Sequence, residues 1–229
     1  MKTIGIIGGM SWESTVEYYR IMNTAVKERL GGLHSARCVI HSVEFGELAD
    51  WLANNEWDKI EDALVAAARS LETAGADFLL IATNTMHKVA GPVAASVKAP
   101  LVHIAETAAE ALIAAGLKTV GLLGTRPTME LDFYRDILAA RGLEVLIPQA
   151  DDRAEMHRII FEELCLGVVS DESRRKGLAM MDRLAGRGAG GLILGCTELG
   201  LLFRPEDTKL PLFDTAVIHA LAAVDKALA

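Results

Sequence analysis

The 229-residue sequence lacks the features of a membrane-spanning chain, a disulfide scaffold or a nucleic-acid-binding protein. No apolar run approaches the length of about 18 residues that a spanning helix needs. The three cysteines stand far apart and form no C-x-x-C pair, and this odd count argues against a disulfide framework or a zinc site. The net charge is −8 and basic residues cluster only at Arg174–Lys176, which argues against nucleic acid or an anionic membrane as a partner.

Several catalytic and targeting motifs are also missing. The sequence contains no P-loop, HExxH or GxSxG, and Gly5-x-x-Gly8-Gly9 departs from the dinucleotide-binding pattern. The six histidines are scattered without the spacing of metal ligands. The short apolar run at the N-terminus is not followed by a small-residue cleavage site, so we expect no signal peptide. These absences predict a cytoplasmic protein with no metal and with reduced cysteines.

The two halves of the chain resemble each other. Four segments recur in the same order, with an offset that drifts slowly near half the chain length, and such ordered agreement predicts a duplicated unit with halves of about 3–112 and 119–229. The matching segments are Thr3–Gly8 with Thr119–Gly124, Glu17–Arg20 with Asp132–Arg135, Leu71–Ile81 with Leu184–Leu194, and Lys98–Leu101 with Lys209–Leu212.

Each half reads as alternating strands and helices. Ile4–Ile7 and Val120–Leu123 are continuous apolar runs that end at glycine, which is typical of strands buried on both faces. Ser14-x-x-Glu17 has the form of a capping box, and Gly31-Gly32 is expected to end the helix that follows it.

This alternation predicts an α/β protein of two pseudo-symmetric Rossmann-like domains, each with a parallel sheet flanked by helices. We expect residues 1–98, together with about 209–229, to form the first domain. Residues from about 99 to 208 are expected to form the second.

Four loops that follow predicted strands are rich in small polar residues. In open parallel sheets, ligands bind outside the carboxyl ends of the strands, so these loops are candidates for holding an anion. Ordinary helix capping uses the same residue types and remains an alternative for each loop. The loops are Gly8–Ser11, Thr83–Thr85, Gly124–Thr128 and Cys196–Glu198.

The internal repeat aligns Thr83 with Cys196, and Asn84 with Thr197, without a gap. Duplicated domains facing each other would place a hydroxyl and a thiol on opposite sides of a small ligand. That arrangement suits inversion of a carbon by proton transfer, in which one group takes a proton and the other delivers one. Cys196 follows an apolar strand at an expected helix start, where the dipole favours thiolate, whereas Thr83 is a poor base because alcohols hardly ionise near neutral pH.

The remaining cysteines and histidines carry weaker signals. Cys38 and Cys165 lie in apolar contexts and are interpreted as structural. Among the histidines, only His87, four residues after Thr83, is expected near the cleft.

Three motifs in this sequence resemble those of the aspartate/glutamate racemase family. The motifs contain Gly5-Ile-Ile-Gly-Gly-Met10, Ala82-Thr-Asn-Thr-Met-His87 and Leu194-Gly-Cys-Thr-Glu-Leu199. The similarity to the family spans the whole chain. The resemblance implies amino-acid racemisation by two bases without pyridoxal phosphate or any other cofactor. It also implies a homodimer and a site between the two domains.

The resemblance also suggests roles for individual residues. Cys196 matches the second catalytic cysteine of the family. Asn84, Thr85 and Thr197 match the donors to the α-carboxylate of the substrate, and the pocket-lining positions are matched by Met10 and Thr125.

Two features depart from the usual family pattern. Thr83 stands where the first catalytic cysteine usually is, as in a Thr/Cys subgroup similar to broad-spectrum and L-aspartate/glutamate-specific racemases. In relatives specific for dicarboxylates, two segments hold the distal carboxylate of the substrate. The matching segments here, residues 45–52 and 162–167, contain no lysine or arginine. Leu52 and Leu166 in these segments are interpreted as an apolar wall. An unpaired carboxylate against leucine is costly, which favours uncharged substrates such as homoserine, methionine or leucine.

Other functions remain open from the sequence. Arg126 could restore aspartate binding, so an aspartate/glutamate-specific racemase is the first alternative. A decarboxylase or cis–trans isomerase of the wider superfamily is the second, and a non-catalytic ligand-binding module is the third. A nucleotide-binding oxidoreductase is the least favoured, because its fingerprint is missing.

Overall fold

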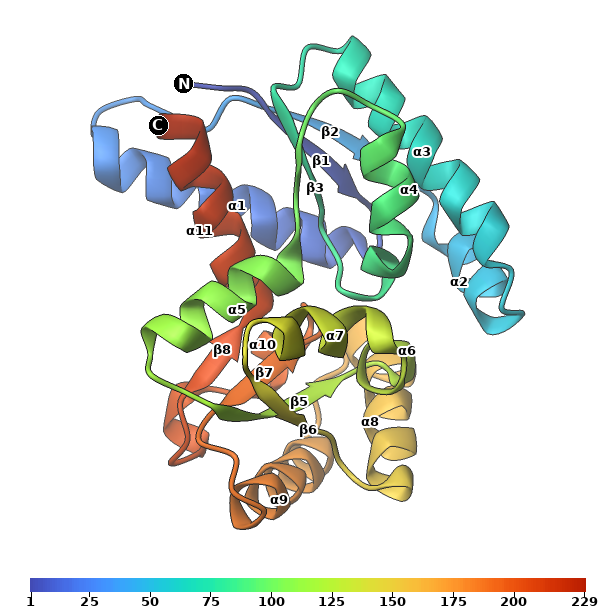
Figure 1. Ribbon diagram of the computed structural model, residues 1–229, viewed down its shortest axis with the longest axis vertical. Coiled ribbons are helices and arrows are strands. Elements are labelled where there is room, and N and C mark those ends of the chain that lie inside the picture. The colour runs from blue at the N-terminus through green and yellow to red at the C-terminus, as the bar shows by residue number, and fades with distance from the viewer. The chain divides into compact units, whose positions relative to one another are not determined.

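Two four-stranded parallel sheets form the framework of the chain, in a computed structural model that describes residues 1–229 (Figure 1). Unit 1 comprises Met1–Ile104 and His219–Ala229, and unit 2 comprises Ala105–Ile218. The chain thus passes between the units twice, within α5 (Ile104–Ala114) and within α11 (Thr215–Leu228). The sequence-based boundaries were residue 98 and about residue 209, whereas the structure has them at Ile104 and His219.

Unit 1 is built on the strand order β2-β1-β3-β4, and every neighbouring pair is parallel. Helix α1 covers one face of this sheet and α3 with α4 covers the other (Figure 1). Its strands are β1 (Ile4–Gly8), β2 (Cys38–Ser42), β3 (Phe78–Ile81) and β4 (Leu101–Val102). Its helices are α1 (Trp12–Leu30), α2 (Phe45–Ala53), α3 (Trp57–Thr73), the 3₁₀ turn η1 (Thr85–Val89) and α4 (Ala90–Ala95), with the end of α11.

Unit 2 repeats this topology with the order β6-β5-β7-β8, again entirely parallel. Identical strand orders in the two units are what a duplicated sequence predicts, and the predicted α/β fold is confirmed. The strands are β5 (Thr119–Gly124), β6 (Glu144–Leu146), β7 (Leu192–Gly195) and β8 (Leu212–Asp214). The helices are α6 (Arg126–Glu130), α7 (Asp132–Ala140), α8 (Ala150–Glu162), η2 (Leu164–Leu166), α9 (Asp171–Gly186), α10 (Leu199–Leu202) and η3 (Pro205–Asp207), with most of α5 and the start of α11.

The central strands follow the apolar runs read from the sequence. All residues of β1, β3 and β7 are buried, as expected for strands with helices on both faces. The predicted capping box at Ser14 is wrong. Helix α1 begins at Trp12, because Ser11 has an extended backbone and its hydroxyl accepts the Ser14 N–H. The helix ends at Gly31 with φ +74°, as the glycine pair predicts.

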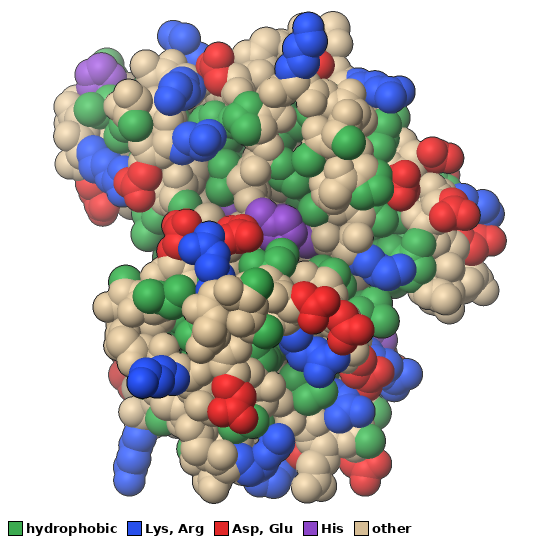
Figure 2. Space-filling view, viewed as in Figure 1, with side chains coloured by type: hydrophobic (Ala, Val, Ile, Leu, Met, Phe, Trp, Pro, Cys, Tyr) green, Lys and Arg blue, Asp and Glu red, His purple; other side chains and the backbone are tan.

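Charged side chains of both signs are interspersed on the face of the molecule shown in Figure 2. Many of them form ion pairs within one helix, as in Glu17–Arg20, or between neighbouring helices, as in Asp152–Arg183. Exposed pairs of this kind contribute at most about 1 kcal/mol each. None of the helices is both long and apolar enough to cross a membrane.

Candidate active site

One group of candidate site residues lies at the carboxyl ends of β1 and β3 in unit 1. After β1, the chain turns at Gly9, whose φ of +90° is the left-handed region that favours glycine. Met10 is buried, and Ser11 caps α1. The Gly9 N–H donates to the Thr15 hydroxyl at 2.8 Å, which ties the loop back to the first turns of the helix.

The loop after β3 carries Thr83, Asn84 and Thr85. Asn84 and Thr85 are buried, whereas Thr83 is half-buried at the strand end. No partner of the Thr83 hydroxyl is found within unit 1, but its carbonyl oxygen accepts a hydrogen bond from His87 Nδ1 at 2.8 Å. Asn84 precedes the η1 turn and makes no side-chain cap bond. The side chains of this loop are therefore not used for capping.

His87 connects the Thr83 loop to the start of α5. Because its Nδ1–H donates to a carbonyl, its Nε2 is the acceptor for the Ile104 N–H at 3.2 Å, and the ring is held as one neutral tautomer. Complete burial is the main cause that lowers the pKa of His87 well below its usual value, and the nearby His103 and His219 lower it further. His87 thus fixes the backbone of Thr83 just after β3.

A second group of candidate site residues lies at the carboxyl end of β7 in unit 2. Gly195 passes so close to β5 that an added Cβ would lie 2.9 Å from the Leu123 carbonyl oxygen. Cys196 follows and is buried, Thr197 is half-buried, and Glu198 is buried. Glu198 Oε2 accepts hydrogen bonds from Cys196 Sγ at 2.9 Å and from Thr197 Oγ1 at 2.8 Å. The thiol is therefore held against a carboxylate.

The expectation that a helix dipole favours the Cys196 thiolate is wrong for this geometry. The helix that follows, α10, has four residues and begins after Glu198, so its dipole is small and displaced from the sulfur. Burial raises the pKa of Cys196 well above its usual value, and the charge of Glu198 raises it further. Cys196 is accordingly a neutral thiol that donates to Glu198.

The four polar loops divide into two kinds. Ser11 and Thr125 are ordinary caps, because their hydroxyls accept the N–H groups of Ser14 and Thr128. The loops after β3 and β7 have no such side-chain cap bond. Helix capping therefore explains the Ser11 and Thr125 side chains but not those of the loops after β3 and β7.

The two leucines of the predicted apolar wall differ in burial. Leu52 on α2 is half-buried and packs against the hydrophobic core of unit 1, while Leu166 at the end of η2 in unit 2 is 71% exposed. Arg126, at the start of α6, is also exposed, and its backbone N–H donates to His157 Nδ1 at 3.3 Å.

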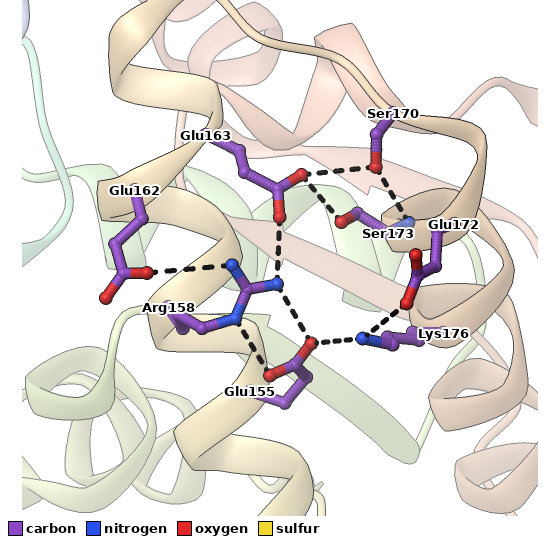
Figure 3. Close-up of polar contacts among 8 residues, drawn as sticks. All are labelled: Glu155, Arg158, Glu162, Glu163, Ser170, Glu172, Ser173 and Lys176. Atoms are coloured by element: carbon purple, nitrogen blue, oxygen red, sulfur yellow. Dashed lines mark hydrogen bonds and ion pairs between the residues drawn. The ribbon is translucent and has the colours of Figure 1, made fainter.

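A polar network holds the loop that carries Leu166 (Figure 3). Glu163, at the end of α8, accepts hydrogen bonds from Ser173 Oγ at 2.6 Å and Ser170 Oγ at 3.2 Å, and it pairs with Arg158 at 2.8 Å. Lys176 on α9 pairs with Glu155 at 2.9 Å. The cations nearest this loop in the network are thus already matched by carboxylates.

Sequence reasoning missed two parts of this arrangement. The contact between Glu198 and the thiol could have been suspected, because a carboxylate two residues from a cysteine in a tight loop is within reach of the sulfur. The pairing of Lys176 on α9 with Glu155 on α8 depends on how the two helices pack, and no local pattern signals it. Arg158, by contrast, pairs with Glu155 within α8 at the i,i+3 spacing. No group of three or more His, Cys, Asp or Glu residues forms a metal-binding cluster in residues 1–229.

Comparison with known proteins identifies the class to which this fold and these loops belong. Residues 7–223 match the profile of the Asp/Glu/hydantoin racemase family. A crystal structure of a Yersinia pestis protein, provisionally assigned as an Asp/Glu racemase, shares 47% identity with a TM-score of 0.93, and 100% of each chain is covered. PH1733 from Pyrococcus horikoshii, an aspartate racemase homologue, shares 36% identity over 100% of both chains with a TM-score of 0.86.

A third relative is the broad specificity amino-acid racemase RacX of Bacillus subtilis, with 23% identity over 99% of this chain and 98% of the relative. The chain belongs to the Asp/Glu/hydantoin racemase family. It is an isomerase of the racemase type, as the resemblance of its three motifs implies.

Proposed function

We propose that the protein racemises free amino acids by proton transfer on opposite faces of Cα, with Cys196 as the thiol base and acid and Thr83 on the other face. The observation that carries this proposal is the equivalence of the two residues in the duplicated fold. Thr83 comes two residues after β3 ends at Ile81, Cys196 directly follows β7, and β3 and β7 hold the same place in their sheets. Two facing sites of this kind suit removal and delivery of one proton.

The neighbouring residues supply the binding part of the proposal. Asn84, Thr85 and Thr197 would hold the α-carboxylate, and Met10 and Thr125 would line the pocket. The carboxylate must be gripped more strongly as negative charge develops on deprotonation, which is the role of preorganised donors. No cofactor is part of this proposal.

Thr83 makes the two directions unequal. An alcohol is a far weaker acid and base than a thiol, so Cys196 abstracts the proton from one antipode, by family analogy the L form, more readily than Thr83 does from the other. The equilibrium constant of a racemase is one, so kcat/KM is the same for both antipodes. The asymmetry is therefore expected in kcat and KM separately.

The preferred substrates are expected to have uncharged side chains, such as homoserine, methionine or leucine. Leu52 and Leu166 carry no charge, and Arg158 and Lys176 near the Leu166 loop are paired with Glu155 and other α8 carboxylates. A distal carboxylate placed against leucine without a partner costs several kcal/mol, of order 2–7 for a polar group. The broad specificity named for RacX supports a range of substrates wider than aspartate and glutamate.

An aspartate/glutamate-specific racemase is the second candidate. The relatives at 47% and 36% identity are described as a provisionally assigned Asp/Glu racemase and an aspartate racemase homologue, respectively. Exposed Arg126, directly after Thr125, is a cation that could reach a distal carboxylate.

A substrate panel with matched variants separates the two candidates. The purified protein is incubated with single L-amino acids (Asp, Glu, homoserine, Met, Leu and Ala), and the D-product is measured by chiral chromatography. We expect turnover of uncharged substrates, and we expect Leu166→Arg to raise the rate with Asp or Glu at least tenfold. Turnover restricted to Asp and Glu, and lost in Arg126→Gln, would favour the second candidate. Cys196→Ala should abolish every reaction, whereas Cys38→Ala serves as the thiol control.

We further infer a cytoplasmic homodimer. Trp12, Val16, Tyr19 and Ile40 form an exposed apolar face on unit 1, which is a candidate surface for association with a second copy. Light scattering after size-exclusion chromatography should give twice the mass of the chain. Trp12→Glu should then shift the protein towards the monomer, and a monomeric wild type contradicts the inference.

A further inference from the structure

The carboxylate of Glu198 is the least expected polar group near the candidate thiol. Its residue is only 4% exposed, yet one of its oxygens accepts hydrogen bonds from both Cys196 Sγ and Thr197 Oγ1. A buried carboxylate is costly unless its hydrogen bonds compensate for the loss of water. The hydrogen bonds from Cys196 and Thr197 contribute to this compensation, and one of them comes from the sulfur that the proposed reaction uses.

The Cys196 thiol donates its hydrogen to the Glu198 carboxylate, so one proton lies between sulfur and oxygen. With the proton on sulfur, the pair holds one negative charge on Glu198, and with the proton on Oε2 it holds one negative charge on Cys196. Both forms have the same net charge, so moving the proton within the pair adds no second charge to a buried site. Ionising the thiol by loss of the proton to water would instead place two like charges about 3 Å apart.

We propose that Glu198 is a catalytic residue that accepts the Cys196 thiol proton when the sulfur becomes the base. This inference rests on the proposed function and extends it to the source of the thiolate. Three observations support it: the 2.9 Å contact, the burial of both residues, and the absence of a long helix that could stabilise a thiolate on its own.

The proton balance of the step is complete. The S–H bond of Cys196 breaks, an O–H bond forms on Glu198, and the electron pair remains on sulfur. The thiolate then takes the α-proton, so the Cα–H bond breaks, a new S–H bond forms, and the electron pair remains on Cα. The second proton on the pair leaves through Glu198 to solvent, and solvent returns one proton to the Thr83 side after Thr83 has protonated Cα. No proton is consumed over one turnover.

Other groups also act on the charge of Cys196. Cys165 on η2, like Glu198, raises the pKa of Cys196, and burial is the largest contribution in the same direction. If Glu198 only suppressed the thiolate, removing its charge would increase both thiol reactivity and racemisation. If Glu198 accepts the proton, removing its charge increases reactivity but decreases racemisation. The two measurements therefore distinguish a proton acceptor from an electrostatic or purely structural residue.

The test uses Glu198→Gln in the full-length protein, in a Cys38→Ala/Cys165→Ala background that leaves Cys196 as its only thiol. Alkylation by iodoacetamide is followed by mass spectrometry across pH, and racemisation is followed with the substrate found active for the wild type. We expect alkylation at pH 7 to rise several-fold and kcat to fall by about 10²–10⁴, the usual range for loss of a general acid or base.

Glu198→Asp serves as the second variant. It retains a carboxylate one methylene further from the sulfur, so we expect a smaller loss of kcat, KM within a few-fold of the wild type, and slower alkylation than in Glu198→Gln. If Glu198→Gln does not fold, as judged by circular dichroism, Glu198→Asp decides, and an unchanged kcat in it overturns the proposal. Racemisation by Glu198→Gln at or above the wild-type rate also overturns it. Failure of the proposed function looks different, because the wild type itself would then show no turnover.

Discussion

His219 connects α11 to α1 and to the end of β4 inside unit 1. Its Nε2–H donates to the Val102 carbonyl oxygen at 2.9 Å, which leaves Nδ1 as the acceptor for the Tyr18 hydroxyl at 2.9 Å. Its residue is fully buried, and burial lowers the pKa of His219 from its ordinary 6.5 to about 4. The folded protein therefore holds this imidazole neutral well below the pH at which an unfolded chain protonates it.

The sign and size of the effect follow from linkage. Between pH 6.5 and 4 the unfolded chain binds more protons at this residue than the folded protein does, so the free energy of unfolding falls as pH falls. With pKa values of 6.5 unfolded and about 4 folded, the loss between pH 8 and pH 5 is about 2 kcal/mol. His87, also buried and with a lowered pKa, adds to the loss in the same direction.

The assay compares His219→Gln with the wild type by urea denaturation at pH 8, 6.5 and 5. A glutamine side chain can donate to Val102 and accept from Tyr18 but does not titrate. We therefore expect the variant to lose about 2 kcal/mol less than the wild type from pH 8 to pH 5. His34→Gln, at an exposed position, is the matched control and should follow the wild type. Equal losses in His219→Gln and wild type would refute the reasoning.

Three further substitutions test the packing and the site. The buried Tyr134 hydroxyl has no protein hydrogen-bond partner, and such a group lowers the free energy of unfolding by about 1–3 kcal/mol. Tyr134→Phe should therefore leave the Tm unchanged or raise it, and a clear decrease in Tm would contradict this. Gly195→Ala should lower the free energy of unfolding by about 1–3 kcal/mol in urea denaturation, because its Cβ would contact the backbone of β5. An unchanged midpoint would show that β5 moves to accommodate the methyl group. Glu163→Gln weakens the charge-assisted hydrogen bonds to Arg158 and Ser173, so we expect it to lower the free energy of unfolding by about 1–3 kcal/mol. It should also speed proteolysis between Leu164 and Ser170, and unchanged cleavage would mean that other contacts hold this loop.

The sequence was most informative where local pattern and tertiary environment agree. The apolar runs of β1 and β7 are buried on both faces, so composition alone indicates their type. The repeat placed Thr83 and Cys196 at equivalent strand ends because duplicated units keep their topology. Ser14 misled the prediction of the helix start, because Ser11 three residues earlier can also cap and the backbone before Trp12 is extended.

The chemistry of the thiol was the harder part to predict. A helix start favours thiolate only if the helix is long enough and the cysteine lies at its first turn, and α10 meets neither condition. Side-chain rotamers decide that Glu198 turns back onto Cys196, and no periodicity records that choice. Likewise, the network around Glu163 joins residues from α8 and α9 that only packing brings together.

We propose above that protons enter and leave Cα on opposite faces through Cys196 and Thr83. It is tested most directly by incubating an active L-amino acid in D₂O and measuring deuterium at Cα of both antipodes during the first few per cent of conversion. Two groups on opposite faces predict deuterium in the D-product and almost none in the recovered L-substrate, with all exchange lost in Cys196→Ala. Equal early labelling of both antipodes, or exchange that persists in Cys196→Ala, would contradict the account.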